Sequence, residues 1–339
     1  MLYISTRNPK DTYTAYRALH EQNAPDGGMY VPFQKLTLTS EDLEQLPAES
    51  FGQTVAKMLN RFFSARLTGW DIECAVGRNP IKLLPLGRRT VVAELWHNLD
   101  QSYSGLEKSI YTLLTGKEQK AAGWAAIAIR IAVICGLVGE MQRDGIHEAD
   151  IAVAAGDFAT PMAIWYCRQM GLPIGMILCG CNENGALWDL LHRGECNTGN
   201  SVVRTTLPEL DIAFPQYLEH LIFATQTQEE FARYLDIVSR GGVYSVEDED
   251  LPKLNDRLCA SVVGSSRVDS VIASVYRTND HFIDPVTALT FGGLQDYRAR
   301  TGENRMTVLL SDTSPKFYGE RIANAIGISG RELLDRLKA

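Results

Sequence analysis

Polar side chains that could act on a small molecule gather in residues 94–109, which read ELWHNLDQSYSGLEKS. They follow a predicted strand at residues 89–97 and lead into a predicted helix at residues 105–116, which is the layout of a catalytic loop. A site filled only for stability is expected to turn apolar, because unpaired buried polar groups are costly. We therefore expect that the loop is exposed or lines a cleft that still binds something. The polar residues are His97, Asn98, Asp100, Gln101, Ser102, Tyr103 and Ser104.

A second candidate loop lies in a predicted strand–helix–strand unit. Residues 149–157 read as a buried strand, residues 160–170 as a helix with Thr160 as its cap, and residues 171–179 as the next strand. Such a unit predicts a right-handed crossover between parallel strands. The amides of residues 157–160 could bind an anion at the helix start, although the charge of Asp157 opposes it.

The remaining elements follow from hydrophobic periodicity and turn residues. We predict a helix at 10–22, two helices within 40–63 with Ser40 as the first cap, and a buried helix at 124–143. Residues 124–139 are too few for a bilayer span and carry Arg130 in their middle. Further predictions are helical structure at 224–262 around a turn at 240–245, a turn and helix at 281–298, a strand at 306–312 and a helix at 315–328.

Composition describes an ordinary globular chain. Its 339 residues allow two domains or one large domain with a second lobe, and 45% of them are hydrophobic. The net charge of −8 and the lack of a basic run argue against a nucleic-acid partner. The N-terminus shows no signal peptide, and seven scattered cysteines predict free thiols in a reducing cytoplasm. Cys179 and Cys181 have no partners at zinc spacing, so we predict no metal site.

Several segments, in order along nearly the whole chain, resemble threonine synthases. In that family Ser-Thr-Arg and Asp-Gly-Gly-Leu-Tyr-Val-Pro open the chain, Glu-Leu-Phe-His precedes the catalytic loop, and a Ser-Gly-Asn-Phe-Gly unit and a Pro-Ala-Lys-Phe segment follow. The matching segments here are residues 3–8, 26–32, 94–97, 154–174, 181–195, 283–289 and 311–317.

The resemblance implies an α/β fold of the fold-type II pyridoxal-phosphate (PLP) enzymes, similar to the tryptophan synthase β subunit, with a parallel sheet. It also implies a parent reaction, the conversion of O-phosphohomoserine and water to threonine and phosphate. That chemistry needs a lysine for the imine with PLP, a Gly/Ser-rich turn for the cofactor phosphate, and a hydroxyl at the pyridine nitrogen.

The chain departs from the family at the lysine. The family pattern Phe-His-Gly-Pro-Thr-x-x-Phe-Lys-Asp-Phe, laid without gaps on residues 96–106, places the lysine on Ser104, whose hydroxyl cannot form an imine. Lys108 lies one helical turn farther on and is the candidate for rescue. Alternatively, Lys108 has no catalytic role and is a solvated lysine that pairs with a carboxylate such as Glu107.

A larger departure is the short distance between Ser104 and Gly156. In the family a further α/β lobe with the phosphate loop stands in this interval, whereas residues 105–155 here are mostly two helices. We therefore expect that the smaller, phosphate-loop lobe is largely missing. A rival alignment takes residues 154–174 as the phosphate-loop unit, but residues 181–195 match the segment that follows the Gly-Asn-Phe unit.

Two single residues also differ from the family motifs. Asp157 stands in place of the Asn, and Val286 stands in place of the His of Asp-Pro-His. Ser311 keeps a hydroxyl at the position near the pyridine nitrogen. His97 survives either as a functional group or as a structural hydrogen-bonding residue. From the polar loop and the resemblance together we predict a ligand-binding set made of Asn98, Asp100, Gly156, Asp157, Phe158, Ser311 and Lys316.

We expect three regions: residues 1–90 like the threonine synthase N-terminus, residues 91–150 with the degenerate catalytic loop and a truncated lobe, and residues 151–339 as an α/β domain. The expected function is a threonine-synthase-like protein without PLP that binds a small metabolite or a protein partner in the cleft. The alternatives are an enzyme of altered chemistry and a PLP-dependent carbon–oxygen lyase that uses Lys108. A lost lobe should leave an apolar face over residues 110–140, so we expect a homodimer or a partner complex, with no nucleic acid and no membrane.

Overall fold

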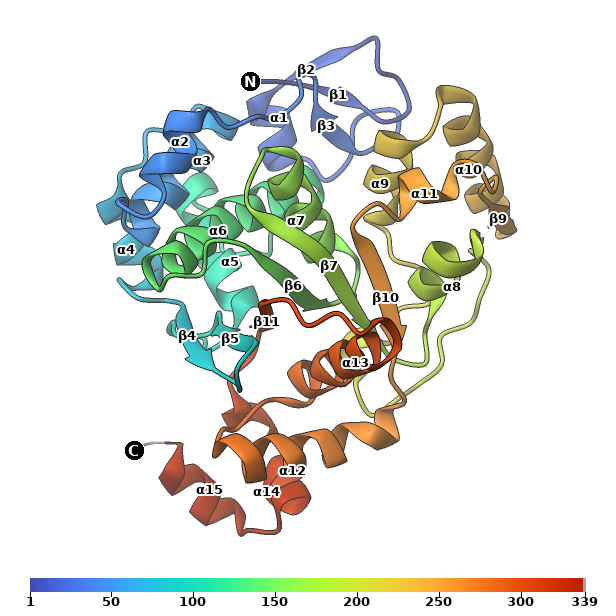
Figure 1. The fold of residues 1–339 in the computed structure, drawn as a ribbon. Coiled ribbons are helices and arrows are strands. Elements are labelled where there is room, and N and C mark those ends of the chain that lie inside the picture. The colour runs from blue at the N-terminus through green and yellow to red at the C-terminus, as the bar shows by residue number, and fades with distance from the viewer. Residues whose placement is uncertain (338–339) are drawn as a thin grey trace.

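The computed structural model describes residues 1–337, so the last two residues of the third predicted region lie outside it. Its centre is a six-stranded sheet with the strand order β10-β7-β6-β11-β5-β4 (Figure 1). All neighbours are parallel except β4 and β5, which are antiparallel. The strands are β4 (Lys82–Pro85), β5 (Thr90–Glu94), β6 (Ala149–Ala154), β7 (Ile174–Cys181), β10 (Leu258–Val262) and β11 (Thr307–Ser311).

Helices cover both faces of this sheet, as parallel strands require. The helix α6 (Gly123–Arg143) packs between α3 (Phe51–Phe63) and α7 (Ala159–Gln169), and α7 contacts β6 and β7. On the other face, α13 (Pro285–Thr301) packs against β6, β7 and β11, with α12 (Val268–Asn279) outside it. Residues from all three predicted regions meet in the main hydrophobic core, for example Phe62, Trp124 and Met162.

The N-terminal residues form a small antiparallel sheet and four helices beside the central sheet (Figure 1). The sheet contains β1 (Leu2–Ser5), β2 (Thr12–Thr14) and β3 (Tyr30–Pro32) in the order β2-β1-β3. The hydroxyl of Tyr3 donates to the Phe62 carbonyl at 2.8 Å, which ties this sheet to α3. The other helices are α1 (Ala15–His20), α2 (Ser40–Gln45) and α4 (Gly69–Val76).

The chain between β7 and β10 forms a peripheral group of short elements. Its antiparallel strand pair is β8 (Glu195–Asn197) and β9 (Val243–Ser245). Its helices are α8 (Ala186–Arg193), η1 (Pro208–Leu210), α9 (Leu218–Thr225), α10 (Gln228–Arg240) and α11 (Leu251–Leu254).

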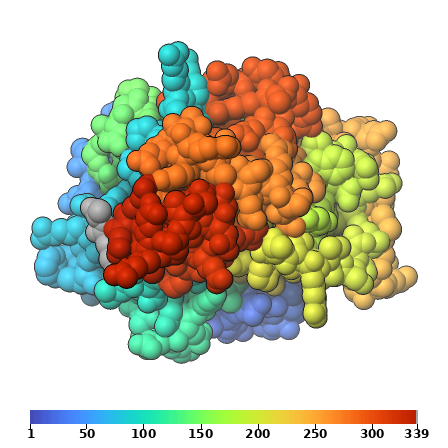
Figure 2. Space-filling view, turned by 90° about the horizontal axis from the view of Figure 1, so that it is seen from below, coloured from blue at the N-terminus to red at the C-terminus, as the bar shows by residue number. Residues whose placement is uncertain are grey.

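The C-terminal helices pack on α12 and form one end of the molecule, where Figure 2 shows the red C-terminal segment against the orange one. They follow β11 and surround the second hydrophobic core, which includes Val275 and Ile322. The elements after β11 are η3 (Pro315–Tyr318), α14 (Gly319–Ile326) and α15 (Gly330–Arg336). A further short helix, η2 (Ser265–Arg267), directly precedes α12.

The connection that follows the candidate catalytic loop is short. The helix α5 (Tyr103–Thr115) ends at Gly116, and α6 begins at Gly123, so only residues 116–122 join them. The part of the chain that the structure describes has no further strand or helix in this interval. The described residues between Ser104 and Gly156 therefore form α5, α6 and the central strand β6, with no further sheet among them.

The helix α6 is long and apolar enough to cross a membrane by its length and composition, but 89% of its most apolar window is buried inside the protein. This burial is what a core helix shows, as predicted for the run around Arg130. The prediction of an apolar face over residues 110–140 is wrong. Among the described residues in this range, Leu113 is the only large hydrophobic side chain that is exposed.

Several local predictions are wrong. Residues 12–14 form β2 and not the start of a helix, because they pair with β1. Thr39, and not Ser40, caps α2 in a reciprocal hydrogen-bond pair with Asp42. Phe158, in a left-handed conformation, occupies the cap position of α7 that was assigned to Thr160. The predicted helical span 224–262 contains β9 and ends in β10, a strand of the central sheet.

Candidate active-site cleft

The loop after β5 is held in place by its own polar groups and by the end of β11. The Asn98 side-chain amide donates to the Ser102 carbonyl at 2.9 Å, and Ser102 Oγ accepts from the Gly105 amide at the start of α5. The Tyr103 amide donates to the Asp312 carbonyl at 2.7 Å. The tip at Leu99 and Asp100 is exposed. The polar residues of the loop thus brace its shape, and the first turn of α5 faces the segment after β11.

His97 lies in a pair of histidines that share one buried carboxylate. Glu94, at the end of β5, is 2.6 Å from His97 Nε2 and 3.4 Å from His281 Nε2. Burial raises the pKa of Glu94, and its bonds to the two histidines outweigh that effect and lower it. The His97 ring also stacks on Trp96. This set orients the loop, which matches the structural role for His97, and His97 does not line the cleft.

A cleft of about 290 Å³ opens between α5, α6, the start of α7 and the segment after β11. Ser104, Gly156 and Asp157, which belong to the two candidate loops, line it together. Val286, at the start of α13, closes one side. No lysine lines the cleft among the residues that the structure describes. The other lining residues are Tyr103, Glu107, Arg130, Ala154, Ala155, Thr160, Glu209, Leu210, Ile212, Asp312, Thr313 and Tyr318.

A buried ion pair forms the wall of the cleft. Glu107 on α5 and Arg130 on α6 approach to 2.9 Å, and both side chains are largely removed from solvent. Burial raises the pKa of Glu107, and Arg130 opposes that effect. Arg130 Nε has no hydrogen-bond partner among the described residues. The predicted local partner of Lys108 is therefore already paired with Arg130.

Asp312 is a half-buried acid in the same wall. Burial raises its pKa to about 7, and the nearby charges of Asp284 and Glu107 add to this, whereas Arg130 opposes it. Its Oδ1 has no hydrogen-bond partner in the described chain. Tyr103 is 3% exposed, and its hydroxyl also has no partner there. Burial raises the pKa of this hydroxyl well above its usual range, so it stays protonated.

The start of α7 contributes Gly156 and Asp157 to the cleft. Gly156 has φ +48° with nothing within 4 Å of where a Cβ would be, so its turn is set by backbone conformation. Asp157 Oδ1 accepts from the Ala159 amide at 3.0 Å. The carboxylate therefore takes one of the amides that the sequence assigned to an anion.

Six predicted ligand-binding or rescue residues do not line the cleft. Phe158 is fully buried in the core, and Asn98 and Asp100 belong to the braced loop. Lys108 is half-buried, and Lys316 is exposed. Ser311 is buried, and its hydroxyl donates to Asp284 at 3.1 Å and accepts from the Trp96 indole at 3.3 Å, so both of its hydrogen-bonding functions are in use.

Sequence reasoning missed the residues that give the cleft its charge, namely Glu107, Arg130, Glu209 and Asp312. Arg130 was visible as a charge inside an apolar helix, a position that usually requires a buried partner. Asp312 was visible beside Ser311. Glu209 sits on η1, far from the family motifs, and no signal in the sequence placed it here.

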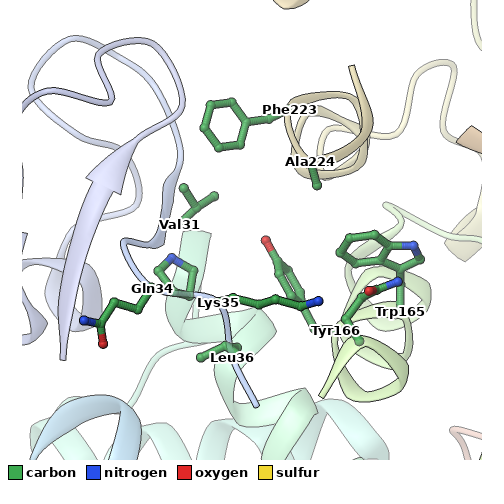
Figure 3. Close-up of a pocket in the computed structure, with 10 residues that line it drawn as sticks. Val31, Gln34, Lys35, Leu36, Trp165, Tyr166, Phe223 and Ala224 are labelled. Carbon is green, nitrogen blue, oxygen red and sulfur yellow. The ribbon is translucent and has the colours of Figure 1, made fainter. Parts of the chain in front are cut away.

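A second cavity, of about 380 Å³, lies between the segment after β3, α7 and α9 (Figure 3). Its walls include Val31, Trp165, Tyr166 and Phe223, with the Lys35 chain across one side. It holds no carboxylate and none of the predicted site residues.

Comparisons with known proteins agree with the resemblance. The family "Threonine synthase N terminus" matches residues 2–78. The threonine synthase of Pseudomonas aeruginosa is 30% identical over 181 residues, which are 51% of this chain and 37% of that protein. The human protein "Threonine synthase-like 1" is 25% identical over 143 residues, 41% of this chain and 19% of that protein. The chain thus matches well under half the length of these relatives.

Solved structures extend the likeness to the whole fold. The PLP-bound threonine synthase of Brucella melitensis aligns with a TM-score of 0.84 over 97% of this chain and 92% of that one, at 16% identity. Yeast threonine synthase aligns with a TM-score of 0.83 over 99% and 94%, at 14% identity. The chain is threonine-synthase-like in sequence, and its α/β fold is that of fold-type II PLP enzymes, as predicted.

Proposed function

We propose that this protein binds a small polar metabolite in the cleft and does not use the imine chemistry of PLP. One observation carries the proposal: the cleft beside Ser104 is lined by four carboxylates and one arginine, with no lysine among its described lining residues. An imine needs a lysine amine within reach. The proposal includes the replacement of the family's lysine by Ser104.

We infer that the residues of the cleft do not fit PLP. A phosphate dianion would lie among the carboxylates Glu107, Asp157, Glu209 and Asp312, and like charges repel strongly at low dielectric. The hydroxyl at the pyridine position, Ser311, is already bonded to Asp284 and Trp96. The short link at residues 116–122 supports the loss of the phosphate-loop lobe.

The test adds PLP to the purified protein, records its visible spectrum and treats it with borohydride. We expect no imine band and no lysine-linked adduct in peptide mass spectra. An adduct that appears in the wild type and disappears in Lys108→Ala would refute the proposal and support a lyase that uses Lys108. Lys117→Ala, in the exposed link, is the matched lysine control.

A second candidate is an enzyme of altered chemistry, and one observation favours it. Asp312, with a pKa of about 7, lies in one cleft with the Ser104 hydroxyl. A general acid or base works best with a pKa near the operating pH. The discriminating measurement is substrate turnover: loss of turnover in Asp312→Asn without loss of ligand binding would favour the enzyme.

A further inference from the structure

The charges of the cleft are unbalanced. Its only described cation, Arg130, is paired with Glu107 at 2.9 Å. Asp157 and Glu209 remain, and Asp312 adds a third negative charge when it is ionised. None of the three has an ion-pair partner within 4.0 Å in the described chain. Glu209 accepts a hydrogen bond from Tyr318, which leaves its charge in place. An empty cleft of this kind is electrostatically unfavourable, and a bound cation would offset the excess.

Two buried polar groups that line the cleft also lack partners. The Tyr103 hydroxyl belongs to a side chain that is only 3% exposed, and Asp312 Oδ1 is inaccessible to solvent. A buried polar group without a hydrogen bond costs about 1–3 kcal/mol. Tyr103 can donate or accept, whereas an ionised Asp312 only accepts, so a ligand with several N–H donors would satisfy both.

We propose that the cleft takes a small organic cation with a primary ammonium group, bound among Asp312, Asp157 and the Tyr103 hydroxyl. This inference rests on the proposed function and names the ligand class of the same site. An ammonium group has three donors and no acceptor, which suits a cleft lined by the oxygens of Asp312, Asp157 and Tyr103. Free phosphates and dicarboxylates are excluded, because they would add negative charge to the same wall.

The size of the cleft limits the rest of the ligand. A volume of about 290 Å³ lies at the lower end of the range for small-molecule sites. Leu210, Ile212 and Val286 supply apolar surface beside the carboxylates. A short alkyl chain that carries the ammonium group therefore suits the cleft.

The experiment is isothermal titration of the full chain at low ionic strength, where electrostatic attraction is least screened. The probe is 1,4-diaminobutane. Butane-1,4-diol, which has the same length and no charge, is the matched neutral probe, and inorganic phosphate is the anion. We expect the diamine to bind at least about tenfold more tightly than the diol, and phosphate not to bind.

Variants locate the site. Asp312→Asn and Glu209→Gln should each weaken diamine binding, the first by about tenfold and the second, at the exposed rim, by less. Tyr103→Phe should weaken it several-fold, roughly the worth of one hydrogen bond. Glu118→Gln, an exposed carboxylate in the 116–122 link, should have no effect. Thermal unfolding of each variant checks that it folds, and the rim variant serves if Asp312→Asn does not fold.

Equal affinities for diamine and diol, or unchanged diamine binding in both carboxylate variants, would overturn the inference. Phosphate binding that Asp312→Asn strengthens would overturn it too, and would leave the proposed function standing. A lysine-linked PLP adduct would instead overturn the proposed function. The failures of the two proposals are therefore distinguishable.

Discussion

At the scale of residues, carboxylates outnumber cations among the residues that line the cleft. Ser104 stands where the resemblance places a lysine, and the nearest cation, Arg130, is committed to Glu107. Asp312 is left without a partner for one oxygen. The individual side chains thus give the cleft an acidic lining.

The Glu107–Arg130 pair gives the first prediction. Arg130→Met should destabilise the fold by about 3–5 kcal/mol, because it leaves Glu107 buried without a partner. The double variant Arg130→Met, Glu107→Leu should recover most of that loss, since an apolar pair needs no counter-charge. Urea unfolding measures both. A single variant as stable as the wild type would show that solvent already screens the pair.

The second prediction concerns pH. Burial and the nearby charges of Asp284 and Glu107, opposed by Arg130, raise the pKa of Asp312 to about 7, above its value of about 3.9 in unfolded chains. Stability from this group is therefore fully present below about pH 4 and lost as the pH rises through about 7.

Asp312→Asn stays uncharged, so its stability relative to the wild type should be higher at pH 8 than at pH 5, by on the order of 1 kcal/mol. Denaturant unfolding at the two pH values checks this difference. Glu118→Gln should show none, and an equal offset for Asp312→Asn at both pH values would contradict the raised pKa.

At the scale of elements, the packing of the 98–105 loop on α5 positions Tyr103 and Ser104. A Cβ at Gly105 would lie 2.3 Å from the Asp100 Cβ, so this position has no room for a side chain. The loop and the helix therefore form one unit, and any change of the loop is transmitted to the cleft through the first turn of α5.

Gly105→Ala is the third prediction. It should cost about 1–3 kcal/mol through overpacking against Asp100 and weaken ligand binding in the cleft. Asp100→Gly in the same chain should restore part of both, because it removes the atoms that the new methyl meets. Gly330→Ala, with nothing within 4 Å of its Cβ position, is the neutral control for thermal unfolding. A larger loss in the control would contradict the packing argument.

The elements that the sequence predicted well are long apolar runs. The helix α6 and the strands β6, β7 and β11 are buried on all sides, and their composition alone marks them. The strand β10 was missed because LCASV is only five residues long and follows helices. The caps of α2 and α7 were misplaced by one or two residues, because cap geometry depends on local backbone angles.

The candidate site was predictable only in part, for a related reason. Ser104, Gly156 and Asp157 follow strands of one parallel sheet, and the ends of such strands meet at one edge. Arg130, Glu209 and Asp312 reach the cleft from elements that are distant in sequence, through packing that no local pattern encodes. Ser311 carries the expected hydroxyl, but Trp96 and Asp284 occupy it, which depends on tertiary contacts.

At the scale of the whole molecule, the chain has the fold of threonine synthases around a six-stranded sheet that is parallel except for β4. Residues 116–122 alone join α5 to α6, and α6 is buried all the same. The core does not depend on a second lobe, because α3 and α7 cover α6.

The fourth prediction is self-association. It stays a prediction, although the apolar face over residues 110–140 from which it was inferred is absent among the described residues. With only Leu113 exposed over residues 110–140, this face offers little apolar area. If the chain forms a homodimer through it, Leu113→Glu should lower the mass measured by light scattering to that of a monomer. Leu334→Glu, on exposed α15, is the control. A dimer that persists in Leu113→Glu would place the interface elsewhere.

The short link between α5 and α6 also makes the molecule modular. Residues 116–120 are exposed, and Gly116 ends α5 in a left-handed turn where an added Cβ would meet no atom within 4 Å. Lengthening such a link adds only loop-closure entropy, about 0.6 kcal/mol for each doubling. An entire foreign domain grafted after Lys117 should thus leave the host fold intact. The same position would let evolution add or delete a lobe beside the cleft while the scaffold beneath it stays unchanged.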